Sequence, residues 1–323
     1  MRATAPGRAL LAAAAVIAAA LSATASARAA EFDSIAPGAF VLTGPALAAS
    51  AAPHEEAGNV GLLVGSDAAL LVDTGASARQ GREVLAAARR ATDRPVRSAL
   101  ISHRQPEFLF GAGALQDAGV PIVTHPRTAE LIAQRCAICL RRSIEAYGAD
   151  AMAETRVPRA DRLAEGDYAV DLGGRRVEVL DFGPASTPGN VAVLDRENGL
   201  LFAGGLVVVG RVPVARDADV AAWIAALDRI ATLPATRIVP GHGPVVAVET
   251  VAALRAYLVA LDAEVRRRYA SGAALSATLD EAALPDYATW VGYPEVHRQN
   301  VLHLYRALEQ AELEGTAPAP TGK

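Results

Sequence analysis

Cysteine, histidine and lysine are scarce in this sequence. It contains 2 cysteines, 6 histidines and one lysine, Lys323, among 323 residues. Cys136 and Cys139 alone cannot form a structural zinc site, which takes four ligands, and Leu140 stands where a c-type haem site would need histidine. The other basic residues are arginines spread along the chain, and the net charge is −4. No basic stripe therefore indicates a nucleic-acid partner.

Long apolar runs are also few, and the first of them has the form of a secretory signal. Arg2 and Arg8 flank the start of an uncharged run over Ala9–Leu21, and Ala27-Arg28-Ala29 then offers small residues at signal-peptidase spacing. The run is too short to span a bilayer, which takes about 20 residues. We predict a signal peptide over 1–29 and a mature chain without a membrane span, in the periplasm or secreted. An uncleaved anchor is the alternative.

Strand-like and helix-like segments alternate through the rest of the chain. Short runs rich in β-branched residues predict strands at Val60–Val72 (a pair), Val96–Ile101, Val120–Thr124, Val177–Phe182, Val191–Leu194 and Leu200–Val209. Longer runs predict helices at Ser77–Arg90, Pro126–Tyr147, Val220–Leu233, Thr250–Tyr269 and Pro294–Leu313. Two strand-rich halves, each with helices, favour an α/β fold of two face-to-face sheets covered by helices. We expect this domain over 30–245, a helical extension over 246–313 and a disordered tail over 314–323.

Five motifs follow one another in an order typical of one family. They are Asp73-Thr74-Gly75, Ser102–Gly111, Gly183–Asn190, Leu201–Val207 and Ile238–Pro244. Together they resemble the metallo-β-lactamase superfamily over residues 35 to 313, and within it the periplasmic branch found beside sulfur-oxidation and quinoprotein-dehydrogenase systems. That branch has a similar helical tail with an Asn-Val pair, here Asn300-Val301. The resemblance implies a four-layer αβ/βα sandwich with a helical C-terminal tail.

The same resemblance implies a zinc site that has lost most of its ligands. The family's His-x-His-x-Asp-His loop is represented by His103, Gln105, Glu107 and Phe108, and its last motif keeps His242. A hydrolytic zinc needs about three protein ligands and an open position for water. We therefore expect no two-metal centre, and at most one weakly held zinc on His103, Gln105, Glu107 and His242.

The replaced positions predict a drier pocket than a hydrolase would have. Ser186 stands at another histidine position and Gly205 at that of the aspartate bridging two metals. The residues expected to line the inherited pocket are Phe108, Ser186, Gly205 and His125. Glu107 and Asp73 are the candidates for a catalytic carboxylate. For Asp73 the alternative is a carboxylate that fixes its loop by bonding backbone N–H groups.

Three functional hypotheses remain open. The loss of ligands favours a non-catalytic or weakly active relative that binds a small molecule or a periplasmic protein partner in the cleft. A metal-dependent ester or thioester hydrolase with a mononuclear site is the alternative. The third is a redox accessory protein working through Cys136 and Cys139, which are a candidate disulfide in an oxidising compartment. Their place inside a predicted helix, rather than at its N-terminus, argues against thioredoxin-like catalysis.

Overall fold

The computed structural model describes residues 29–51, 56–293 and 295–315. The predicted signal peptide and nearly all of the predicted tail lie outside the described residues. Within them, no helix combines the length and the apolar character needed to cross a bilayer.

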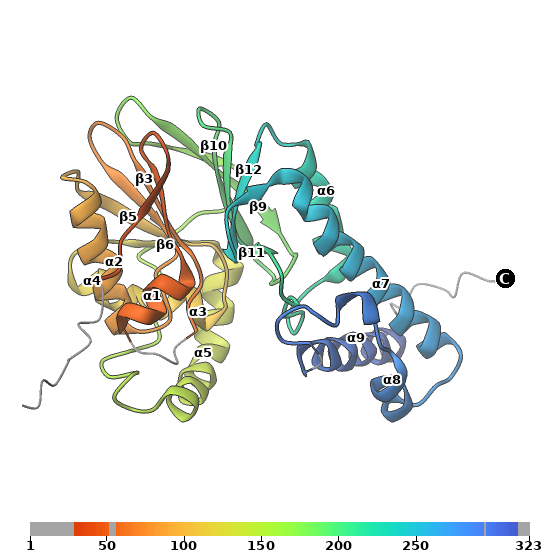
Figure 1. Ribbon diagram of the computed structural model, residues 1–323. Coiled ribbons are helices and arrows are strands. Elements are labelled where there is room, and N and C mark those ends of the chain that lie inside the picture. The colour runs from red at the N-terminus through yellow and green to blue at the C-terminus, as the bar shows by residue number, and fades with distance from the viewer. Residues whose placement is uncertain (1–28, 52–55, 294, 316–323) are drawn as a thin grey trace, which may run out of the picture.

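Two β-sheets form the centre of the described chain (Figure 1). The first has the order β1 (Asp33–Ala36), β2 (Ala39–Leu42), β3 (Val60–Val64), β4 (Ala69–Val72), β5 (Val96–Ile101), β6 (Ile122–Thr124) and β7 (Arg162–Leu163). The second has the order β13 (Val246–Ala247), β12 (Arg237–His242), β11 (Leu200–Val208), β10 (Asn190–Asp195), β9 (Arg176–Gly183) and β8 (Tyr168–Asp171). Pairing is antiparallel from β1 to β4, parallel from β4 to β7, and antiparallel in the second sheet except between β11 and β12.

Helices cover the outer face of each sheet. On the first side these are α1 (Gly44–Ala51), α2 (Ala78–Ala91), α3 (Pro106–Leu109), α4 (Ala112–Asp117) and α5 (Pro126–Tyr147). On the second side they are α6 (Val220–Thr232), α7 (Val251–Ala270), α8 (Leu275–Glu281) and α9 (Glu295–Leu313). One apolar core lies between the two sheets. A second lies between the first sheet and its helices, and a third lies between the second sheet and its helices. This confirms the predicted four-layer αβ/βα sandwich with a helical C-terminal region.

The long elements begin and end within one or two residues of their predicted positions. The strand signal is strong where both faces are buried, as in β10 and β11, whose residues are all buried. The sequence did not predict β1, β2, α1 and α8, which are short and mostly lack a clear periodic pattern. In α1, small and apolar residues occupy every face of the helix, so no contrast between an apolar and a polar side indicates its presence.

The C-terminal helices pack on the second half and hold the segment that follows β11. Asn300 in α9 is buried, donates from Nδ2 to the carbonyl of Pro213 (2.7 Å) and accepts the N–H of Ala215 at Oδ1 (2.9 Å). The backbone N–H of Val212 also donates to the carbonyl of Val291 (3.0 Å). The helical extension therefore fixes the backbone just before residues 216–217, which reach the candidate site.

Candidate functional site

Asp73 lies at the end of β4 and holds the loop that follows β5. Its Oδ1 accepts the backbone N–H of Ser102 (2.8 Å) and its Oδ2 accepts the Ser102 hydroxyl (2.8 Å). Its φ of 66° is in the left-handed region, which aspartate tolerates better than most residues. Burial raises the pKa of Asp73 to about 7, although the two hydrogen bonds from Ser102 act in the opposite direction. These contacts are those of a carboxylate that fixes a loop.

His103 and Gly205 lie against each other although they are far apart in the sequence. The Ser102 hydroxyl oxygen lies 2.8 Å from His103 Nδ1, and the Gly205 N–H is directed at the same nitrogen from 3.3 Å. The Nε2 of the ring is buried and has no hydrogen-bond partner among the described residues. Burial lowers the pKa of His103 to about 4, which keeps the ring neutral. A Cβ at position 205 would lie 2.3 Å from Nε2, so the histidine ring occupies the space of a side chain there.

The ring of Phe108 lies between the two histidines of the candidate metal site. Its centroid is 4.5 Å from that of His103 and 5.2 Å from that of His242, and the residue is fully buried. Gly58 makes room for it, because a Cβ at that position would lie 2.0 Å from a ring carbon of Phe108. An apolar ring thus separates the imidazoles of His103 and His242.

Glu107 faces His242 on the other side of this ring. His242 Nε2 lies 3.4 Å from Glu107 Oε1. Burial raises the pKa of Glu107, but the hydrogen bond and charge of His242 outweigh it and bring the pKa below its ordinary value. The carboxylate is therefore engaged by a neighbouring imidazole.

Three residues of the tentative metal site, His103, Glu107 and His242, are not gathered into one metal-binding cluster in this arrangement of the described side chains. No group of three or more His, Cys, Asp or Glu side chains in the described chain is placed to hold a metal ion. The physical reason is the Phe108 ring, which keeps His103 apart from the pair formed by Glu107 and His242. The mononuclear zinc site itself stays a prediction, which metal analysis of the protein tests.

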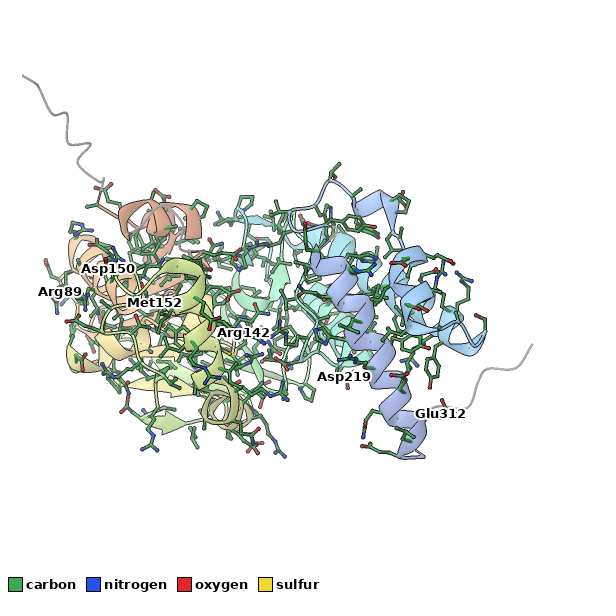
Figure 2. All side chains as sticks on the ribbon, turned by 90° about the horizontal axis from the view of Figure 1, so that it is seen from below. Arg89, Arg142, Asp150, Met152, Asp219 and Glu312 are labelled. Atoms are coloured by element: carbon green, nitrogen blue, oxygen red, sulfur yellow. The ribbon has the colours of Figure 1, made fainter. Side chains whose placement is uncertain are left out.

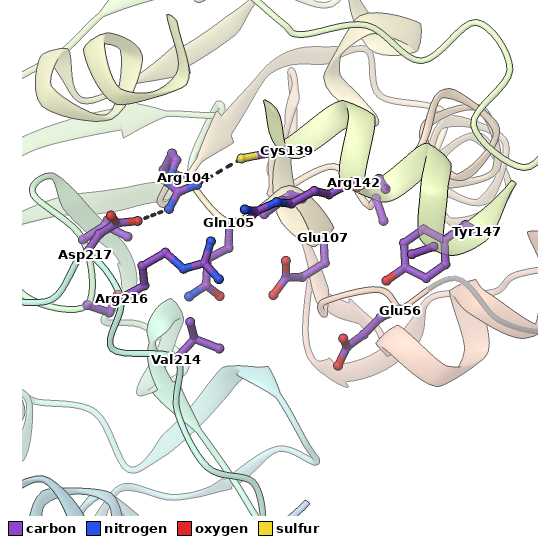
Figure 3. Close-up of a pocket in the computed structure, with 16 residues that line it drawn as sticks. Glu56, Arg104, Gln105, Glu107, Cys139, Arg142, Tyr147, Val214, Arg216 and Asp217 are labelled. Carbon is purple, nitrogen blue, oxygen red and sulfur yellow. Dashed lines mark hydrogen bonds and ion pairs between the residues drawn. The ribbon is translucent and has the colours of Figure 1, made fainter. Parts of the chain in front are cut away.

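A cavity of about 310 Å³ lies beside this buried cluster (Figure 3). Its wall comes from the loop after β5, from α5 and from the segment after β11. The charged residues around it are Glu56, Arg104, Glu107, Arg142, Arg216 and Asp217. Since the two helix-covered halves both contribute, the cavity lies where they meet, and Figure 2 places Arg142 there.

Three arginines converge on the cavity from separate segments. Arg104 is buried and pairs with Asp217, which also pairs with Arg135. Arg142 and Arg216 have no hydrogen-bond or ion-pair partner within the described ranges. Partial burial, and then repulsion by Arg142 and Arg104, lower the pKa of Arg216. The wall thus holds three arginines and three carboxylates, but Arg142 and Arg216 present guanidinium groups that no described carboxylate pairs with directly.

The residues expected to line the pocket have different positions in the structure. Ser186 lines the cavity, whereas Phe108 and Gly205 are buried beneath it. His125 is the N-cap of α5, where Nδ1 accepts the backbone N–H of Arg127 (3.1 Å). Its Nε2 lies 3.3 Å from Asp181. His125 is therefore not part of the lining of this cavity, and its two ring nitrogens serve a helix cap and a carboxylate.

Both cysteines lie on α5 as free thiols in the structure, and their pairing in an oxidising compartment stays a prediction. Cys136 is buried in the core between the first sheet and its helices. Cys139, one turn later, is half-buried, lines the cavity and accepts a hydrogen bond from Arg104 Nη1 at 3.3 Å. A continuous helix directs the first thiol into the core and the second toward the cavity.

Comparison with known proteins identifies the family. The family model described as the metallo-β-lactamase superfamily matches residues 55–242, more than half of the chain. The chain belongs to the metallo-β-lactamase superfamily. The match ends at His242 in β12, before the C-terminal helices. No curated protein matches the chain.

Solved metallo-β-lactamases share the fold at low sequence identity. The enzyme from Pontibacter korlensis is 23% identical with a TM-score of 0.58, covering 71% of this chain and 98% of its own. FIM-1 from Pseudomonas aeruginosa, solved in its mono-zinc form, is 20% identical with a TM-score of 0.56, covering 72% and 97%. The enzyme from Hirschia baltica is 20% identical with a TM-score of 0.55, covering 71% and 97%. These similarities concern the fold alone.

The metallo-β-lactamase fold implies zinc, and the residues present here do not fit it. Gln105 and Ser186 offer at most neutral oxygens, Phe108 offers an apolar ring, and His103 turns its Nδ1 to a backbone N–H. Arg104, Arg142 and Arg216 were not predicted as site residues, because arginines are scattered along the whole sequence. Arg104 lies inside the recognised loop, and its position between the retained His103 and the replaced Gln105 was the one available signal.

Proposed function

We propose that this metallo-β-lactamase-fold protein binds a small anionic molecule, as a periplasmic or secreted relative without hydrolytic zinc chemistry. The observation that carries the proposal is the pair Arg142 and Arg216, which line the cavity and form no hydrogen bond or ion pair with another described residue. Guanidinium groups bind carboxylates and phosphates through paired N–H donors, so this is the ligand chemistry that the wall favours.

The electrostatics of the cavity support an anion rather than a neutral ligand. The nearby carboxylates are already engaged, Asp217 by Arg104 and Arg135, and Glu107 by His242. A bound anion would relieve the repulsion among the arginines that lowers the pKa of Arg216. The Ser186 hydroxyl also lies at the wall, and because its oxygen accepts from Asn190 Nδ2 (2.9 Å), its proton is available to the same ligand.

The lost ligands argue against the hydrolase alternative. Zinc hydrolysis depends on a metal that lowers the pKa of its bound water and on protein ligands that leave a position open. Here His103 is neutral and packs against the tilted ring of Phe108, and Glu107 is held by His242. This arrangement supports an inherited cleft used for binding.

Titration calorimetry with isophthalate, a rigid aromatic dicarboxylate, tests the binding proposal. We expect saturable binding to the mature protein, weakened about tenfold or more when Arg142→Gln and Arg216→Gln are combined, because a hydrogen bond to a charged group contributes about 1.5–3 kcal/mol. The matched control is Arg89→Gln, an exposed arginine on the outer side of the first half (Figure 2). Equal weakening by the control, or no binding of isophthalate or phosphate, would refute the proposal.

Metal content and hydrolysis test the proposal that the protein lacks hydrolytic zinc chemistry. After dialysis, elemental analysis should find less than about one zinc per chain, because fewer than the usual three ligands converge. Hydrolysis of β-lactams and thioesters should be negligible. Chelator-sensitive turnover of a generic ester, or about two zincs per chain, would contradict it, and His103→Ala would then be the first variant to examine.

A further inference from the structure

Cys139 occupies a different environment from a structural cysteine. It lies on α5 at the wall of the arginine-lined cavity, while Cys136 is fully buried one turn earlier (Figure 3). Arg104 Nη1 donates to Cys139 Sγ at 3.3 Å, and Asp217 holds the same guanidinium from the opposite side. Cys139 is therefore the accessible member of the pair and is directly hydrogen-bonded by a cation.

A second observation at the same wall indicates a ligand. Arg104 is only 6% exposed, yet its Nε has no hydrogen-bond partner in the described residues. A buried N–H without a partner costs about 1–3 kcal/mol, so a molecule that reaches it gains from satisfying it. Arg142 and Arg216 add two more unpaired guanidinium groups around the same space. The thiol and the unpaired cationic donors thus share one cavity.

We propose that Cys139 is a nucleophilic thiolate that exchanges with a small anionic disulfide held by Arg104, Arg142 and Arg216. The proposal rests on the anion site proposed above and names the chemical class of its ligand. The Cys139 sulfur attacks one sulfur of the disulfide, an S–S bond forms between them, and the original S–S bond breaks. The other half leaves with the electron pair as a thiolate, and Cys139 becomes a mixed disulfide.

The groups around Cys139 stabilise its thiolate. The hydrogen bond from Cys136 is the largest cause, and with Arg104 and Arg216 it lowers the pKa of Cys139 to about 6 despite burial. The same interaction, together with burial, raises the pKa of Cys136, which keeps that thiol protonated as the donor. The charged and titratable groups facing Cys139 are Cys136 from α5, Arg104 and its partner Asp217, and Arg216. Thiolates of this pKa are present at neutral pH and remain good nucleophiles.

The test compares an anionic and a neutral disulfide on the full mature protein. Dithiobis(nitrobenzoate) carries carboxylates, and dipyridyl disulfide carries no charge at neutral pH. We expect both to react at Cys139, assigned by the loss of reaction in Cys139→Ser. Arg142→Gln should slow the anionic reagent about tenfold and leave the neutral one nearly unchanged, since charge focusing accelerates only charged reactants and Arg142 is not among the groups that lower the pKa of Cys139. An equal effect on both reagents, or an unreactive Cys139, would overturn the inference.

The pH profile with the neutral reagent separates thiolate stabilisation from simple accessibility. The rate should rise with a midpoint near pH 6. Cys136→Ala should move the midpoint upward, and Cys136→Ser should restore part of the shift because its hydroxyl still donates. A midpoint near about 8.5, the value of a free cysteine, would also overturn the inference. Isophthalate contains no disulfide, so its binding tests the anion site separately: binding without exchange removes only this inference.

Discussion

Replacing Phe108 with alanine is the most direct perturbation of the candidate site. The ring is fully buried between the imidazoles of His103 and His242. It also lies against the backbone of Gly58 and Gly241, where an added Cβ would come within 2.0 Å and 3.1 Å of ring atoms. These neighbours are two packed rings and two backbone segments, so they can close only part of the space that the ring leaves.

The expected cost follows from the buried volume that is lost. Truncating a buried phenylalanine to alanine costs about 3–5 kcal/mol, and the upper part of that range applies where the surroundings do not collapse. We expect Phe108→Ala to lower the free energy of unfolding by about 3–4 kcal/mol. Phe108→Leu keeps most of the volume and should cost less than about 1.5 kcal/mol.

Urea denaturation of the mature protein, followed by fluorescence and circular dichroism, measures both values. The midpoint should fall in the order wild type, Phe108→Leu, Phe108→Ala, with an unchanged slope if compactness is unaltered. A loss below about 1 kcal/mol for Phe108→Ala would refute the reasoning. It would mean that the ring does not fill a closely packed place between the two histidines.

The remaining predictions concern three other buried positions. Folding raises the pKa of Asp73 from 3.8 to about 7, so this residue stabilises the folded state most at low pH. That stabilisation is lost as pH rises from about 4 to about 7, by up to about 4 kcal/mol. Asp73→Asn should flatten this part of the pH–stability curve measured by urea denaturation. Asn59→Ala should lower the thermal midpoint and cost about 2–4 kcal/mol, since the side chain makes three backbone hydrogen bonds of 2.8–2.9 Å; a neutral effect would contradict this. Gly205→Ala should lower the free energy of unfolding by about 1–3 kcal/mol, because its Cβ would lie 2.3 Å from His103 Nε2. A double-mutant cycle with His103→Ala should show a coupling energy of at least about 0.5 kcal/mol. Additive effects would show that the clash is absent.

Local sequence patterns were sufficient for the layers of the fold. Continuous apolar segments such as β11 predict strands buried on both faces, and α5 begins at Pro126 and ends at Gly148 as its sequence indicates. These features depend on neighbouring residues in the chain, so they could be obtained without coordinates. The meeting of His103 and Gly205, which are 102 residues apart, was expected instead from the resemblance of the ordered motifs to the superfamily.

The contents of the site depended on distances between residues far apart in the sequence. The sequence showed that Phe108 replaces a ligand, but only the structure shows its ring between His103 and His242. Likewise, Arg142 and Arg216 come from a helix of one half and a loop of the other, and Asn300 in the last helix fixes the backbone of that loop. Charge interaction and steric exclusion act through space, so the convergence of these side chains was decided by the packing of the two halves.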